Sequence, residues 1–151
     1  MEKYDPQVAA RVWQRVKGEP PQEHDEAQLQ AMIQQEQHAA AVYLQLSRRF
    51  PGKDAAALHR LAADAQSHSA CLRGIYSLVT GQSAASQTVS VPQEPLEAAL
   101  RRCYGRAMHT LTQYEHWSSH REYGPVFSRL AQQEQEHCRI LLELLGKQHR
   151  K

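Results

Sequence analysis

The segment from Leu130 to Gly146, LAQQEQEHCRILLELLG, places a carboxylate and an imidazole at the start of a strongly apolar helical pattern. Glu134 and His137 are three residues apart, and residues at this spacing share one face of a helix. That face continues through Leu130 and Leu141, so both polar groups are expected to point into a core. Polar groups buried there need a charge partner or a metal ion.

Two other apolar patterns in the chain are interrupted by a similar polar residue. Glu36 lies between Ile33 and Ala40 in the first pattern, and His68 precedes Leu72 in the second. The third pattern carries no carboxylate and has Ala107 at the matching level. The polar interruptions therefore fall at one depth of a predicted helical bundle.

The two halves of the chain also form a weak internal repeat. Glu36 and Ala107 each lie seven residues before a tyrosine, Tyr43 and Tyr114. His68 is preceded at position 65 by alanine, whereas the matching histidine of the last pattern is preceded by Glu134. The chain is therefore predicted to contain two related helix pairs.

The elements that must position these residues are predicted to be α-helices, because good helix formers dominate the chain and strand-like alternation is nearly absent. A short N-terminal helix is expected from Asp5, with Pro6 at its first position. Four longer helices follow: Asp25 to about Arg49, Asp54 as N-cap to Gly81, Pro95 to Trp117, and about Pro125 to Gly146. The stretch GQSAASQTVSVPQEP between the second and third predicts a long crossover or a flexible linker.

Short, long and short connections between four helices predict an all-α, ferritin-like four-helix bundle with a long crossover between helices 2 and 3. Residues 1–24 form the N-terminal helix and linker, 25–146 the bundle, and 147–151 a basic tail. The length of 151 residues suits one domain, and a net charge of +2 gives no nucleic-acid footprint.

Cellular location is predicted from what the sequence lacks. The N-terminus has no apolar region typical of a secretory signal, and no apolar run reaches the roughly 20 residues of a membrane span. The three cysteines, Cys71, Cys103 and Cys138, form no Cys-x-x-Cys pair and suit buried thiols in a reducing compartment. A cytoplasmic protein with no membrane partner is expected.

Across residues 25–146 the chain resembles the rubrerythrin-type ferritin-like domain family. In that family two helices each supply a Glu and two each supply Glu-x-x-His around two metal ions. The resemblance implies that four of the six expected metal ligands are present and two are replaced by alanine, at positions 65 and 107. The predicted ligands are Glu36, His68, Glu134 and His137.

The loss of two carboxylates changes the expected charge balance. Glu36 and Glu134 supply two negative charges, which balance one divalent ion, and uncompensated buried charge is costly. One transition-metal ion or none is therefore predicted, with iron implied by the resemblance and zinc or manganese suited to the same ligands. Asp64, Cys103 and Tyr104 are the nearby residues that could complete a second site.

The resemblance implies redox or oxidative-stress chemistry, so any enzyme would be a rubrerythrin-like oxidoreductase supplied by an external electron donor. Whether the chain is an enzyme stays open at this point. The alternative is a non-enzymatic helical-bundle interaction protein with a relic metal site, in which the carboxylates and histidines pair without an ion. Iron storage is not favoured, because the crossover and the extra helix do not suggest a closed shell.

Other residues have more ordinary expected roles. Tyr43 and Tyr114 are expected to pack in the core, with a carboxylate of a facing helix as the alternative partner of each hydroxyl. His38 and His109 are expected to point away from the bundle axis. Trp13 is expected either to pack against one end of its own bundle or to contact a second subunit in a homodimer. The dimer contact is preferred, because a short amphipathic helix on a linker can reach a neighbour.

Overall fold

The computed structural model describes residues 23–150, which fold into four α-helices with no strand among them. They are α2 (Glu23–Ser47), α3 (Gly52–Thr80), α4 (Leu96–Trp117) and α5 (Gly124–His149). The predicted all-α, four-helix class is confirmed for this range. The predicted N-terminal helix and Trp13 lie outside it. None of the described helices is long and apolar enough to cross a membrane.

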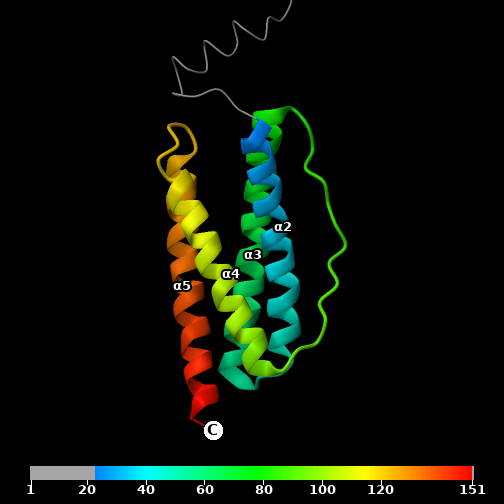
Figure 1. Cartoon of the computed structure of the whole chain (residues 1–151), viewed down its shortest axis with the longest axis vertical. Coiled ribbons are helices and arrows are strands. Elements are labelled where there is room, and N and C mark those ends of the chain that lie inside the picture. The colour runs from blue at the N-terminus through cyan, green and yellow to red at the C-terminus, as the bar shows by residue number, and fades with distance from the viewer. Residues whose placement is uncertain (1–22, 151) are drawn as a thin grey trace, which may run out of the picture.

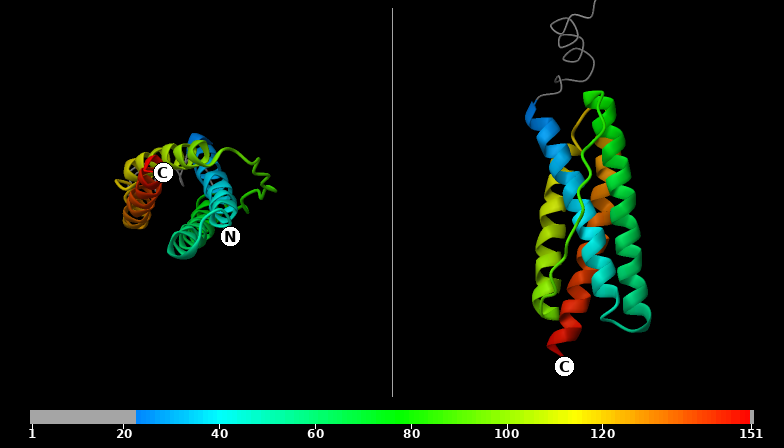
Figure 2. Two further views of the ribbon diagram at one scale, coloured as in Figure 1. Left: turned by 90° about the horizontal axis from the view of Figure 1, so that it is seen from below. Right: turned by 90° about the vertical axis from the view of Figure 1, so that its right-hand side faces the viewer.

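The helices form two antiparallel pairs that lie side by side (Figure 1). Within each pair, α2 with α3 and α4 with α5, the backbones approach closely over much of their length. The backbones of different pairs approach each other at far fewer places. The end-on view in Figure 2 shows the two pairs as two arms, and their backbones approach each other both where α2 faces α4 and where α3 faces α5.

A layer of polar residues divides the core into two apolar clusters. The first cluster fills one end of the bundle, and its members include Leu46, Leu58, Leu100, Leu141 and Leu144. The second fills the other end, and its members include Leu29, Ile33, Leu72, Tyr114 and Phe127. Each cluster draws side chains from all four helices, so apolar burial stabilises the docking of the two pairs. The polar residues singled out in the sequence lie between the clusters.

Helix ends agree only in part with the sequence pattern. α3 ends as predicted at Gly81, whose φ of 72° is the left-handed conformation that glycine adopts at helix C-termini. Asp54 was predicted as the N-cap of this helix, but Pro51 occupies that position and Asp54 lies in the first turn. The Asp54 carboxylate instead accepts a hydrogen bond from Lys147 Nζ at 2.9 Å, which joins the start of α3 to the end of α5.

The prediction that Gly146 ends the last helix is wrong, because α5 continues to His149. Gly146 does not take the positive φ that would turn the chain out of the helix. A glycine inside a helix costs only about 1 kcal/mol relative to alanine. The contact between Lys147 and Asp54 helps to keep the following turn helical.

The segment between α3 and α4 is a long crossover that returns along the outer side of α2 (Figure 1). Side chains of α2 bind its backbone near both ends. Gln30 exchanges two hydrogen bonds with Ala85, and Gln45 donates to the carbonyl of Val91 at 2.9 Å. Arg49 donates to the carbonyl of Glu94. These bonds fix the path of the crossover over α2 and leave residues 86–90 as the span between the attachments at Ala85 and Val91.

Candidate metal centre

Three of the predicted ligands converge in the polar layer. Glu36 on α2, His68 on α3 and Glu134 on α5 each offer one ligand atom, and these atoms all lie within 4.8 Å of one another. His68 Nδ1 lies 2.7 Å from Glu36 Oε2 and 3.6 Å from Glu134 Oε1. Each of the three residues is only 2 % exposed. The arrangement therefore presents nitrogen and oxygen donors to one small volume among buried side chains.

The fourth predicted ligand, His137, borders this cluster. Its Nδ1 lies 3.7 Å from Glu134 Oε2, is buried, and has no hydrogen-bond partner. Its Nε2 lies 2.9 Å from Asp64 Oδ2. Because a carboxylate oxygen accepts, Nε2 carries the proton, and Nδ1 of the neutral ring keeps a free lone pair. The imidazole is thus held with its electron-donating nitrogen on the side of the cluster.

The two histidines are held in the same way by the opposite helix. His68 Nε2 on α3 donates to the Gln133 side-chain oxygen on α5, as His137 Nε2 on α5 donates to Asp64 on α3. Asp64 lies four residues before His68, and Gln133 lies four residues before His137. The two rings are nearly parallel, with centroids 5.8 Å apart. The internal repeat seen in the sequence therefore corresponds to a reciprocal pair of contacts across the bundle.

Burial and hydrogen bonding shift the pKa values of Glu36 and His68 in opposite directions. Burial raises the pKa of Glu36 to about 8, although the hydrogen bond with His68 lowers it. Burial lowers the pKa of His68, but hydrogen bonds to Glu134 and Glu36 outweigh it and raise the value to about 10. Without an ion, the cluster therefore retains protons at neutral pH, and a metal ion must displace them in order to bind.

None of the three residues considered for a second metal site joins this cluster. Asp64 binds the outer nitrogen of His137, on the side away from Glu134. Cys103 lies in the first apolar cluster, where burial raises the pKa of its thiol to about 12. Tyr104 is partly buried against the same cluster. The alanines at positions 65 and 107 are both buried and bring no donor to the polar layer.

Two tyrosines enclose the histidines, one from each apolar cluster. The ring of Tyr43 meets that of His137 edge-on at 6.1 Å, and Tyr114 meets His68 in the same way at 6.3 Å. Burial raises the pKa of both hydroxyls well above the usual value, so both stay protonated. The buried Tyr114 hydroxyl has no hydrogen-bond partner. The predicted core packing of both tyrosines is confirmed.

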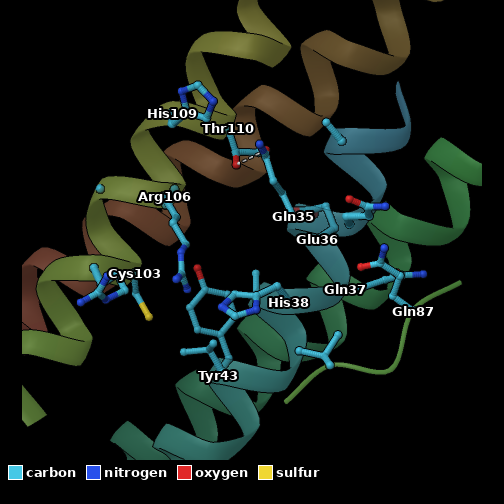
Figure 3. Close-up of a pocket in the computed structure, with 18 of the residues that line it drawn as sticks. Gln35, Glu36, Gln37, His38, Tyr43, Gln87, Cys103, Arg106, His109 and Thr110 are labelled. Atoms are coloured by element: carbon cyan, nitrogen blue, oxygen red, sulfur yellow. Dashed lines mark hydrogen bonds between the residues drawn. The ribbon is translucent and has the colours of Figure 1, made fainter. Parts of the chain in front are cut away.

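A cleft of about 870 Å³ between α2 and α4 leads to the cluster from one side, and both Glu36 and Glu134 line it. Ala107, one of the two positions at which the sequence resemblance expected a carboxylate, also lines it. His38 lies at this cleft together with the more exposed His109 (Figure 3). Because the side chain of Ala107 is short, space remains beside the cluster.

The positioning roles of Asp64 and Gln133 were not predicted from the sequence. A signal for them is present in the repeat, since each lies one helical turn before a histidine of the polar layer. Comparisons with protein-family models, curated proteins and solved structures found no match to this chain. The function is therefore argued from the geometry of these side chains.

Proposed function

We propose that this protein binds one transition-metal ion in the polar layer of the bundle, through Glu36, His68, Glu134 and His137. The observation that carries the proposal is the buried Nδ1 of His137, which has no partner and lies 3.7 Å from a carboxylate oxygen. A buried acceptor left unsatisfied costs about 1–3 kcal/mol. Coordination of an ion satisfies that nitrogen together with the three donors beside it.

The outer contacts of both histidines support the same proposal. Histidines that bind metals usually donate their second ring nitrogen to a carboxylate, carbonyl or similar acceptor, which fixes the tautomer and the ring orientation. Asp64 and the Gln133 side-chain oxygen are such acceptors for His137 and His68. Both rings therefore present Nδ1 toward the carboxylates, as a shared ligand set requires.

The number of carboxylates favours a single ion. Two carboxylates and two neutral imidazoles balance the charge of one divalent cation, whereas a second cation would add uncompensated charge in a buried layer. This donor set suits Zn²⁺, Fe²⁺ or Mn²⁺. The resemblance to the rubrerythrin-type family extends the proposal to iron and to redox or oxidative-stress chemistry, with electrons from an external donor.

Metal content and affinity test this proposal directly. Protein purified without chelators should contain about one equivalent of transition metal, and the chelated protein should bind about one Zn²⁺ in a calorimetric titration. His137→Ala and Glu134→Gln should weaken binding by at least about tenfold, because each removes a donor to the ion. His59→Ala serves as the matched control, since His59 is exposed on α3 outside the cluster.

The outcome that overturns the proposal is equally concrete. A folded protein that binds none of Zn²⁺, Fe²⁺ and Mn²⁺, and shows no rise in melting temperature with them, has no metal centre. Binding that survives unchanged in both ligand variants places the ion elsewhere. Two equivalents in the unaltered chain contradict the charge argument.

A non-enzymatic bundle with a relic site is the second candidate function. Its supporting observation is the 2.7 Å contact between His68 Nδ1 and Glu36 Oε2, which satisfies both groups without an ion. In such a protein the polar layer serves only to fix the register of the helices, and activity resides on the outer surface. Metal-free protein that is fully folded and gains no stability from any of the three ions supports this candidate.

A further inference from the structure

The cleft between α2 and α4 is larger than the metal centre needs. Small residues line it on both helices, including Ala31 and Ala39 on α2 and Gly105 and Ala107 on α4. Residues 87–90 of the crossover border it on the outside. Its volume of about 870 Å³ falls within the range of roughly 300–1,000 Å³ typical of small-molecule sites. The cleft is present because these residues have short side chains or none.

One cation in the cleft lacks a carboxylate partner. Arg106 extends from α4 into the space between α4 and α2 (Figure 3), and no described residue forms an ion pair with it. By contrast, Arg102 is paired with Glu94 at 3.0 Å. Burial, together with the charge of Arg106, lowers the pKa of His38, so this histidine is neutral at pH 7. Arg106 is thus the lining cation whose charge is left unbalanced by the described part of the chain.

The remaining walls are suited to an organic molecule rather than to an inorganic anion. Val42 and the ring of Tyr43 supply apolar surface on the α2 side. The side-chain oxygen of Gln37 is buried at the cleft without a hydrogen-bond partner, so it can accept from a ligand hydroxyl. Glu36 and Glu134 at the inner end bring carboxyl groups and no cation, so they offer no partner to a second negative charge on the ligand. A ligand with one negatively charged group next to Arg106 and an otherwise uncharged body fits all of these surfaces.

We propose that this cleft is a binding site for a small organic monocarboxylate. Its carboxylate pairs with the Arg106 guanidinium, and its body lies against Val42 and Tyr43 beneath residues 87–90 of the crossover. A guanidinium binds a carboxylate through two parallel hydrogen bonds, which orients the ligand as well as holding it. The charged group that binds the ligand, Arg106, is not one of the proposed metal ligands, and ligand binding needs no metal ion.

The test uses benzoate and its neutral counterpart benzamide as probes, with the full chain stripped of metal. Calorimetry and amide chemical shifts are recorded for both. Benzoate should bind with at least tenfold higher affinity than benzamide, and the shifted amides should belong to residues 37–43 and 102–110. Arg106→Gln should reduce benzoate affinity by about tenfold or more, as the loss of a charge-assisted pair requires.

Matched variants test whether benzoate binds in the cleft itself. Arg101→Gln removes an exposed charge from the same helix and should leave benzoate affinity unchanged, because Arg101 pairs with Glu97 outside the cleft. Ala107→Leu narrows the cleft while retaining Arg106, and it should weaken binding. Equal binding of benzamide, equal loss in Arg101→Gln, unchanged affinity in Ala107→Leu or absence of benzoate binding each overturns the proposal. Tighter binding of inorganic phosphate than of benzoate also overturns it.

A metal requirement is tested by the same measurements. Because the titrations begin with metal-free protein, failure to find a metal ion leaves their outcome intact. The proposed metal site and the proposed carboxylate site can therefore be refuted independently.

Discussion

Replacement of Asp64 by alanine should weaken metal binding although Asp64 is not a ligand. The Asp64 carboxylate lies 2.9 Å from His137 Nε2, the nitrogen that faces away from the cluster. Without it the imidazole can take the other tautomer, which places a proton on Nδ1 and removes the lone pair needed by an ion. The ring also loses the contact that fixes its orientation.

The structure sets the size of the expected effect. Loss of such an outer partner typically reduces metal affinity by about 10–100-fold. The Asp64 side chain is 45 % exposed, so water can replace part of its hydrogen bond. We therefore expect the lower end of the range, about tenfold, or roughly 1.4 kcal/mol. Metal-free stability should fall by less than about 1 kcal/mol, since partly exposed ion pairs contribute little.

Competition titration with a chromophoric zinc chelator measures this loss, and denaturant unfolding of the metal-free variants measures stability. Gln133→Ala removes the equivalent partner of His68 and should cost less affinity, because a neutral amide accepts more weakly than a carboxylate. Glu143→Ala is the control for loss of one acidic residue, since Glu143 is exposed and paired with Arg139. Wild-type affinity in Asp64→Ala, or an equal loss in Glu143→Ala, refutes the reasoning.

Three further outcomes are expected. Zinc affinity should fall as the pH is lowered from about 8 to 6, because the ion must displace protons from Glu36 and His68. Burial raises the pKa of Glu36 to about 8, and hydrogen bonds to the neighbouring carboxylates outweigh burial and raise the pKa of His68 to about 10. Titrations in weak buffer should therefore detect about two protons released per ion near pH 7. An affinity independent of pH contradicts this. The double variant Ala65→Glu, Ala107→Glu introduces the two carboxylates that the resemblance expects at these positions and should raise the metal content from about one equivalent to two; a content that stays at one shows that charge does not set the number of ions. Leu72→Ala empties a fully buried position and should lower the free energy of unfolding by about 2–5 kcal/mol in denaturant titrations while metal stoichiometry is retained; a loss below about 1 kcal/mol would show that this part of the core is loosely packed.

The helices were predictable because apolar periodicity and chain breakers act over short distances. The 3.6-residue pattern identified each buried stripe, and Gly81 marked the end of α3. The prediction that the last helix ends at Gly146 was wrong, because glycine permits a turn without requiring one. The helix continues past Lys147, which contacts Asp54. The same periodicity placed Glu36 and His68 at one depth, and the structure brings them within 2.7 Å. Whether an ion joins them stays a prediction.

The features that escaped prediction depend on side chains that meet across helices. Asp64 was considered only as a ligand of a second metal site, and only the fold shows that it reaches His137 on α5. The position of Gln133 beside His68 depends in the same way on how α3 and α5 dock. The cleft arises where short side chains such as Ala107 leave space, and an absent side chain leaves no periodic signal in the sequence.

The division of the bundle into two closely paired arms has a consequence for its assembly. Each arm joins helices that interact over much of their length, and α2–α3 and α4–α5 are each connected by a short turn. Contacts between neighbours in sequence form quickly, whereas contacts across the long crossover form later. Glu36 and His68 belong to one arm, and Glu134 and His137 to the other. The polar layer is therefore completed only at the final docking step, so an ion that binds there stabilises the assembled form over the separate arms.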